Sequence, residues 1–529
     1  MATKKSFLIL SVILTLAIVL TACGGSNNSN SGGNAPAAES SAPAATSAEP
    51  SADTGSEGGI DTSAEAHLKM IFIGPKPIDY DSVFAEINKK LKEEINATIE
   101  GEFLDWSDWA QKYPLKLAAN EDFDLIYSAN WAGYNDQALK GGFLELTEEM
   151  LAKYMPSAWE AMPKVSWDQA KVNGKLYMVP QNRGESVEKL ILYREDLRKK
   201  YDLPAIDSPE AYANYLKTVA KNEKGMLPFT PETGDWKYHN LDRVLLKQEN
   251  EWNMFDLDMP FAFKLNDPQG QIFNVYETQE FKDLALYYKD LADNNAWSKN
   301  ALNSKNDHQQ DFKQGKTASI THNNGTLGAL MALMRQENSP YEVALADINP
   351  DKAKSVAIST QNGTSIHATS KNAERALMFL DLMQNDKELH DLMMYGIEGV
   401  HYEKSGEDKY IATDKNPNYT GFSNWSFNSP LNRDNVDFPQ EASDLVKKWE
   451  AQVYHYPLET FVFDNSKVKT EISNLGNVML RYAIPLEYGV VKDVDGGLAE
   501  LNKQLKAAGL DKVQQELQAQ VDAFLAAQK

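Results

Sequence analysis

The amino-acid composition changes abruptly near residue 67, and this change divides the chain into a part that cannot fold and a part that can. From Gly24 to Ala66 nearly every residue is Ser, Gly, Ala, Asn, Pro or acidic, and Ile60 is the one large aliphatic side chain. Such a segment buries too little apolar surface to offset the entropy lost on ordering. We therefore expect residues 23–66 to be a disordered tether that spans about 35 Å on average.

The first residues have the pattern of a secretory signal, with two early lysines and an apolar run from Phe7 to Leu20. This run is shorter than the roughly 20 residues that a membrane span needs. The segment Leu20-Thr21-Ala22-Cys23 resembles the bacterial lipobox, in which the cysteine becomes the mature N-terminus and carries a diacylglyceryl group. The resemblance implies a lipoprotein signal peptide at residues 1–22 and lipidation of Cys23, the only cysteine. The alternative is an ordinary signal peptide with a chance cysteine.

The chain from His67 to Lys529 has the composition of a globular body, since the whole sequence is 42% hydrophobic and 10% aromatic. A body of this length exceeds what one hydrophobic core usually serves, so two or more lobes are expected. The formal net charge of −23 argues against a nucleic-acid partner, which requires a basic surface.

Strand and helix patterns alternate at the start of this body. His67–Gly74 (HLKMIFIG) and Phe123–Tyr127 (FDLIY) are typical of buried strands, and Asp81–Ile95 between them has apolar residues at helical spacing. This order indicates an α/β layer. Further along, Asn372–Tyr395 is expected to be one long helix. Leu498–Ala527 is expected to be a helical tail whose apolar stripe consists of Leu501, Leu505, Leu510, Val513, Leu517 and Val521.

Several segments, in this order, resemble family 1 extracellular solute-binding proteins, the receptors of carbohydrate ABC importers. They are Lys116–Ala129 (KLAANEDFDLIYSA), Gly142–Pro156 (GFLELTEEMLAKYMP), Asn173–Pro180 (NGKLYMVP), Asp311–Ile320 (DFKQGKTASI) and Asn372–Asp381 (NAERALMFLD). The resemblance covers roughly Leu68 to Val400. It implies an α/β, two-lobed, type II periplasmic-binding-protein-like fold that closes on a ligand between its lobes.

Two further segments, Tyr395–Tyr402 (YGIEGVHY) and Leu498–Phe524, resemble a LipO-like subset of lipoproteins with an extra C-terminal domain of unknown function. We therefore expect lobe 1 at residues 67–180 together with 365–400, and lobe 2 at residues 181–360 together with 401–490. Residues 491–529 are expected to form a C-terminal helical segment.

Catalytic and metal-binding signatures are missing from the sequence. It contains neither Gly-x-Ser-x-Gly nor His-Glu-x-x-His, and its eight histidines show no metal-ligand spacing. Asp493-Val494-Asp495-Gly496 is similar to part of a calcium loop, but the first and twelfth loop positions are Val491 and Asn502, which cannot supply the required carboxylates. We expect no catalytic residue, no metal and no cofactor.

Aromatic side chains that can stack on a sugar ring are the first group of candidate ligand contacts. Trp131 and Tyr134 follow the Phe123–Tyr127 strand, and ligands bind at the carboxyl ends of strands in such sheets. The alternative is packing within their own lobe, and for Trp106 and Trp109 core packing is an equal reading. Trp236 lies in a Gly-Asp-rich loop of the expected second lobe. Trp425, with two neighbouring phenylalanines, forms either a satellite core or a stacking platform.

Polar side chains that can bind sugar hydroxyls are the second group. Gln181, Asn182 and Arg183 follow the first expected crossing between lobes, where they line the ligand site or solvate a hinge. Asn323 follows the strand of the Asp311–Ile320 segment, and the alternative is a helix cap. Asn362 belongs to the second expected crossing, where turn chemistry alone explains an Asn-Gly pair. Glu398 completes the group, with a structural role as its alternative.

The resemblance and the tether together imply a receptor on the extracytoplasmic face of a cell membrane, attached through lipid on Cys23. We expect it to capture a soluble ligand, an oligosaccharide, and to deliver it to ABC permease subunits without chemical change. Two alternatives remain open at this point. One is a surface lipoprotein with a sensing or chaperone role, and the other is a carbohydrate-active enzyme.

Overall fold

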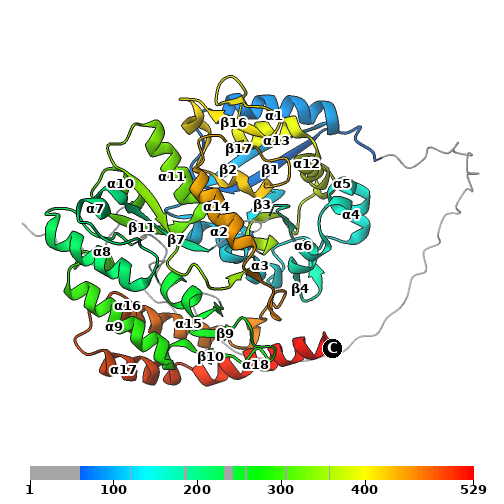
Figure 1. Cartoon of the computed structure of the whole chain (residues 1–529). Helices are drawn as coiled ribbons and strands as arrows, with labels where there is room; N and C mark the ends of the chain where they lie inside the picture. The colour runs from blue at the N-terminus through cyan, green and yellow to red at the C-terminus, as the bar shows by residue number, and fades with distance from the viewer. Residues whose placement is uncertain are drawn as a thin grey trace, which may run out of the picture. The chain divides into compact units, whose positions relative to one another are not determined.

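The computed structural model describes residues 60–528, apart from residues 120, 184–187, 232–240, 242, 256–258, 304–306 and 357. Figure 1 shows helices on both sides of several short sheets. The buried apolar side chains of this region form two large cores. One core gathers residues from Ala66 to Val179 and from Ile366 to Phe427, and the other gathers residues from Ile191 to Ile348 and from Tyr456 to Val521. The body therefore has two lobes.

The sheet of the first lobe has the strand order β2 (Ala97–Leu104), β1 (Ala66–Ile73), β3 (Leu125–Ser128), β14 (Gly363–Ile366) and β6 (Val179–Pro180). Strand β1 pairs in parallel with β2 and β3, whereas β14 is antiparallel to both of its neighbours. Because β1, β2 and β3 are parallel, their carboxyl ends lie at the same edge of the sheet.

Helix α1 (Tyr80–Ile95) buries the stripe that its sequence predicts, Val83, Phe84, Ile87, Leu91 and Ile95. The predicted helix at 372–395 is instead two helices, α12 (Ala373–Asn385) and α13 (Lys387–Tyr395). The break lies at Asp386, whose carboxylate accepts the backbone N–H groups of Glu388 and Leu389 at 2.9 Å each. An aspartate in this position caps a new helix and so ends the preceding one.

The sheet of the second lobe places β7 (Lys189–Arg194) between β11 (Ser319–Asn323) and β12 (Val343–Ala346), antiparallel to both. Helix α8 (Pro209–Asn222) begins after Ser208, whose hydroxyl accepts the Ala211 N–H at 3.3 Å, and a proline occupies its first position. A second small sheet consists of β8 (Trp252–Met254), β9 (Phe261–Lys264) and β10 (Phe273–Asn274). Helices α9 (Gln279–Asp293), α11 (Asn324–Gln336) and α14 (Gln440–Glu450) complete this lobe.

The shorter elements connect these larger ones. They are α2 (Trp109–Ala119), α3 (Tyr134–Leu139), α4 (Glu148–Tyr154), α5 (Pro156–Ala161), α6 (Lys164–Gln169), β4 (Lys171–Val172), β5 (Lys175–Leu176), α7 (Glu195–Lys200), α10 (His308–Lys313), β13 (Lys354–Ser355), β18 (Val453–Tyr454) and α16 (Ile484–Glu487).

The segment that follows α13 belongs to a different lobe than expected, since the sequence predicts that residues 401–490 lie with the second lobe. It forms β15 (Tyr402–Lys404), β16 (Lys409–Ala412) and β17 (Asp434–Asn435), and it buries Phe422 in the first core. The Phe422 ring lies edge-on to Phe72 of β1 at 5.3 Å. The chain therefore stays with the first lobe until about residue 435 and enters the second lobe with α14. A lobe boundary of this kind depends on long-range packing, which local sequence patterns do not report.

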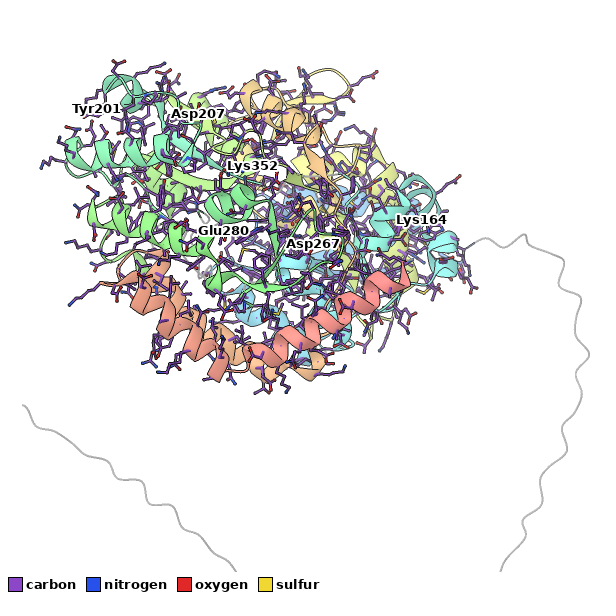
Figure 2. All side chains as sticks on the ribbon, turned by 60° about the horizontal axis from the view of Figure 1, so that its bottom comes forward. Lys164, Tyr201, Asp207, Asp267, Glu280 and Lys352 are labelled. Carbon is purple, nitrogen blue, oxygen red and sulfur yellow. The ribbon has the colours of Figure 1, made fainter. Side chains whose placement is uncertain are left out.

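The C-terminal helices pack on the second core. They are α15 (Lys469–Val478), α17 (Val494–Ala507) and α18 (Leu510–Ala527), and the last two bury all six residues of the predicted apolar stripe. The single predicted helix is divided at Gly509, whose φ of 103° lies in the left-handed region that favours glycine. Figure 1 shows α17 and α18 below α9, β9 and β10, and Figure 2 shows both helices crossing the near face.

One segment, residues 459–465, contacts both lobes, and we call it the linking segment. The Gln169 side chain of the first lobe donates to Glu459 at 2.7 Å, and Asn465 donates to Asp136 of the first lobe at 2.9 Å. On the other side, Phe461 packs against Phe524 of α18 with ring centroids 5.4 Å apart. The linking segment is therefore fixed by the C-terminal helix and bonded to the first lobe.

The chain enters β1 at the edge of the sheet opposite the carboxyl ends of the parallel strands. The buried guanidinium of Arg375 donates to the carbonyls of Asp61 and Ala64 at 3.4 Å each. The Asn96 amide donates to the Thr62 carbonyl at 2.9 Å. These bonds hold the residues before β1 in place.

Candidate functional site

Five aromatic side chains meet at the carboxyl ends of β2 and β3, and we call them the aromatic wall. Trp106 and Trp109 follow β2, Tyr127 belongs to β3, Trp131 lies in the 3₁₀ turn Asn130–Ala132, and Trp425 lies in the turn Ser423–Phe427. This is the edge at which ligands bind in sheets of this kind.

The rings of the wall contact one another in a continuous series. Trp106 stacks on Trp425 with centroids 5.9 Å apart and planes 11° apart. Trp109 meets Trp131 edge-on at 5.6 Å. The Tyr127 ring touches both groups, lying 5.8 Å from Trp131 and 6.4 Å from Trp425. Contacts of this kind fix the ring orientations.

The wall has a buried base and a partly exposed surface. The Tyr127 ring is completely buried, whereas Trp106 is 38% exposed. Trp109, Trp131 and Trp425 are half-buried. An indole that is held in place and still reaches solvent is the type of surface on which a sugar ring can stack.

Three of the indole N–H groups already have acceptors within the protein. Trp106 donates to the Gly421 carbonyl at 3.1 Å, Trp131 donates to the Gln361 carbonyl at 2.8 Å, and Trp425 donates to the Tyr127 hydroxyl at 3.3 Å. Because an indole has a single donor and no acceptor, these tryptophans offer a ligand their ring faces.

Two buried amides lie behind the wall. The Tyr127 hydroxyl donates to Asn362 Oδ1 at 2.6 Å, and Asn362 Nδ2 donates to Gln181 Oε1 at 2.9 Å. Gln181 is 2% exposed and Asn362 is 4% exposed. The sequence predicts these two amides as ligand contacts, and the structure places both side chains below the surface. They support the wall from behind.

Tyr134, predicted with Trp131 as a ligand contact or as packed within its own lobe, is not part of the wall. Its side chain is fully buried, stacks on Phe143 at 5.9 Å, and donates its hydroxyl proton to the Ala170 carbonyl. Burial raises the pKa of this hydroxyl far above its ordinary value. Tyr134 lies on α3, one turn beyond Trp131, and this small shift places it inside the lobe.

The other predicted polar residues lie apart from these rings. The backbone N–H of Asn182 donates to the Asn428 carbonyl at 2.8 Å, and the exposed Arg183 pairs with Asp434 at 3.1 Å. Asn323 caps α11 by accepting the Thr326 N–H at 2.8 Å, which is the alternative role considered above. Glu398 is exposed and pairs with Lys404 at 2.7 Å. Cys23 and Trp236 lie outside the described residues.

The sequence reasoning did not identify Tyr127 as a site residue. An aromatic residue within a continuous apolar strand is typical of a core position, and Tyr127 is indeed buried. The one feature of the sequence that could have indicated Tyr127 as a site residue is its position near the carboxyl end of a strand, four residues before Trp131.

Acidic and histidine side chains do not converge into a metal site anywhere in the part of the chain that the structure describes. Nor does any helix of that part combine the length and the apolar character needed to cross a bilayer.

Comparison with known proteins identifies two regions. Residues 74–389, more than half of the chain, match the model of the bacterial extracellular solute-binding proteins. Residues 457–526 match a domain of unknown function, DUF3502. The second match begins just before the linking segment and includes α15, α17 and nearly all of α18.

Individual proteins align over different shares of the chain. A carbohydrate ABC transporter substrate-binding protein of Streptococcus pneumoniae serotype 4 is 26% identical over 483 residues, covering 88% of this chain and 92% of that protein. The polygalacturonan/rhamnogalacturonan-binding protein YtcQ of Bacillus subtilis is 34% identical over 159 residues, covering 28% of this chain and 31% of that protein.

A solved structure has the same fold. The N-glycan transport solute-binding protein NgtS of Streptococcus pneumoniae, in complex with Man1GlcNAc, superposes with a TM-score of 0.72 at 24% identity, covering 87% of this chain and all of that one. This match confirms the predicted two-lobed α/β fold of the periplasmic-binding-protein type. A family of this kind binds solutes and does not transform them, so the prediction that the chain is not an enzyme is also confirmed. The chain belongs to the bacterial extracellular solute-binding proteins, with a C-terminal DUF3502 domain.

Proposed function

We propose that this protein is a lipid-anchored receptor that captures an oligosaccharide between its two lobes and delivers it to an ABC permease. The observation that carries the proposal is the aromatic wall. Four tryptophans are arranged there with fixed ring planes, and at least three direct their N–H groups into the protein. Ring faces of this kind bind the apolar C–H surface of a sugar.

The similar proteins support the same ligand class. The names of two of them specify carbohydrate or polygalacturonan, and NgtS was crystallised with Man1GlcNAc and with Man5GlcNAc. A wall formed by several adjacent indoles presents more than one stacking surface. An extended ligand with several sugar rings fits such a surface better than a monosaccharide does.

Binding by the wall is tested with a panel of oligosaccharides that includes Man1GlcNAc, Man5GlcNAc and polygalacturonan fragments. A ligand at 100 times its dissociation constant stabilises the folded state by about 2.7 kcal/mol, which a thermal-shift measurement detects. Trp425→Ala should weaken the binding of a positive ligand by about tenfold, because a stacking contact is removed.

Trp159→Ala is the matched control for this variant. Trp159 is a partly buried tryptophan of the first lobe that packs on Trp167 at 5.1 Å, outside the wall. It should leave the dissociation constant unchanged. The absence of any stabilising oligosaccharide, or equal loss of affinity in both variants, would contradict the proposed role of the wall.

The lipid anchor is tested separately through Cys23. Two or more acyl chains hold a protein at a membrane stably, whereas one chain alone does so only marginally. Cys23→Ala should therefore release the folded protein into the medium with its ligand affinity intact. Fractionation of cells and medium by immunoblot measures this, and a Cys23→Ala protein that stays with the membrane would contradict the anchor.

A further inference from the structure

Two of the segments that cross between the lobes meet directly behind the aromatic wall. The first crossing begins at Gln181, after β6, and the second ends at Asn362, before β14. The Gln181 backbone N–H donates to the Asn362 carbonyl at 2.9 Å, and the Asn362 side chain donates to the Gln181 side chain at 2.9 Å. The two crossings are therefore joined by a backbone bond and a side-chain bond at the first-lobe end of each.

From this junction, hydrogen bonds lead to the wall. Asn362 accepts from the Tyr127 hydroxyl at 2.6 Å, and the same hydroxyl oxygen accepts from the Trp425 indole at 3.3 Å. Trp425 in turn stacks on the exposed Trp106. Four side chains, which come from four distant parts of the sequence, thus form one chain of hydrogen bonds.

The direction of every bond in this chain is fixed by chemistry. An indole nitrogen can only donate, so the Tyr127 oxygen accepts and its own proton is directed to Asn362. The Asn362 carbonyl oxygen must then face Tyr127, and its NH₂ group faces Gln181 Oε1. Reversing the Asn362 amide would set its NH₂ group against the Tyr127 O–H and its oxygen against Gln181 Oε1, which costs buried groups about 1–3 kcal/mol. The chain therefore reorganises as a unit.

We propose that Gln181, Asn362 and Tyr127 are positioning residues that transmit the conformation of the two crossings to Trp425. A change at the crossings, such as lobe closure, moves the junction of Gln181 and Asn362. That movement reorients the Tyr127 hydroxyl and, through it, the indole on which the ligand stacks. The proposal rests on the proposed function, because the wall is taken as the ligand surface.

The test is made without ligand, so its result does not depend on the outcome of the oligosaccharide panel. The full-length Cys23→Ala chain is labelled with 5-fluorotryptophan, and the ¹⁹F resonance of Trp425 is assigned by its loss in Trp425→Phe. Gln181→Met keeps the side-chain length and removes the Oε1 acceptor of the Asn362 amide. This variant should shift the Trp425 resonance, although Asn362 and Tyr127 lie between the two residues in the chain of bonds. Asn88→Ala is the matched control, because it removes an amide paired with Ile99 elsewhere in the first lobe.

A double-mutant cycle separates transmission from general structural damage. Tyr127→Phe removes one hydroxyl from the middle of the chain of bonds. In that background, Gln181→Met should no longer shift the Trp425 resonance. The proposal is overturned if Gln181→Met leaves the Trp425 resonance where it is in the parent chain. It is also overturned if the shift persists in full when Tyr127 is Phe, because the signal would then travel by another route.

Tyr127→Phe removes only one hydroxyl group, and it allows a second measurement, the hydrogen exchange of the Trp425 indole. Without the hydroxyl, the Trp425 indole N–H loses its acceptor, so its exchange with solvent deuterium should accelerate by about fivefold. Unchanged exchange would show that the Tyr127–Trp425 bond does not hold the indole, and the proposal would fail.

Discussion

His367 is a buried titratable residue of the first lobe, and its surroundings determine how stability depends on pH. Its ring stacks on Phe123 with centroids 4.3 Å apart and accepts or donates a bond with the Thr369 hydroxyl at 3.1 Å. Burial lowers the pKa of this imidazole below its usual 6.5, although the carboxylate of Asp124 acts in the opposite direction. The folded state therefore disfavours the charged ring.

We predict that the free energy of unfolding falls as the pH drops below 6.5 toward the lowered pKa of His367. In that range the unfolded chain binds a proton that the folded chain excludes, so protonation favours unfolding. Above 6.5 both states carry neutral imidazole and the contribution is complete. Urea denaturation at about pH 8 and about pH 5.5 measures how much the free energy of unfolding falls between the two pH values. This fall should be smaller in His367→Gln than in the parent chain. Equal losses would show that another group controls this range.

The residues of the wall also show which individual site residues can be predicted from the sequence. Trp131 could be identified because it follows a strand, and Trp425 because it lies in an aromatic cluster. Their common partner Tyr127 could not, since it is 298 residues from Trp425 in the chain and belongs to an apolar strand. The burial of Gln181, Asn362 and Tyr134 could not be predicted either, because it depends on contacts between distant segments.

Helix α18 is stabilised mainly by one apolar face, which the sequence identified correctly. Leu510, Val513, Leu517 and Val521 recur at helical spacing and are all at most 1% exposed. Because this spacing is a local property of the sequence, it can be recognised without knowledge of the fold. The break at Gly509 was missed, because a glycine within a helical pattern is compatible with either a continuous helix or a cap.

We predict that Leu517→Ala lowers the free energy of unfolding by about 3 kcal/mol, since it leaves a cavity in the second core. Gln515→Ala is the control on the exposed face of the same helix and should change the free energy by about 0.5 kcal/mol at most. Equilibrium denaturation followed by circular dichroism measures both values. Similar small effects in both variants would mean that α18 is not part of the cooperative core.

For the molecule as a whole, the linking segment connects the C-terminal domain to the first lobe. Glu459 accepts from Gln169 of the first lobe, Asn465 donates to Asp136, and the backbone of Asp464 is bonded on both its N–H and C=O groups to Gln520 of α18 at 2.9 Å each. The DUF3502 domain therefore carries a contact from the second core to the first lobe. We therefore expect this contact to limit the relative motion of the lobes.

We predict that the double variant Glu459→Ala/Asn465→Ala broadens the distribution of distances between the lobes. Spin labels at the exposed positions Lys153 and Lys221, changed to cysteine in the Cys23→Ala chain, report that distance by pulsed electron paramagnetic resonance. The control is Glu500→Ala, which removes an exposed ion pair with Lys503 within α17. The same distribution in the double variant and the control would show that the linking segment does not limit opening.

The bonds that Arg375 makes to the residues before β1 lie where a mechanical load on the preceding chain would enter the body. If the chain before residue 60 is pulled while a partner holds the aromatic wall, the force acts along β1 from one end to the other. Because β1 has β2 on one side and β3 on the other, it cannot be peeled from the sheet like an edge strand. The load is shared by the hydrogen bonds along Ala66–Ile73 at once, so these bonds resist a pull along the strand in shear.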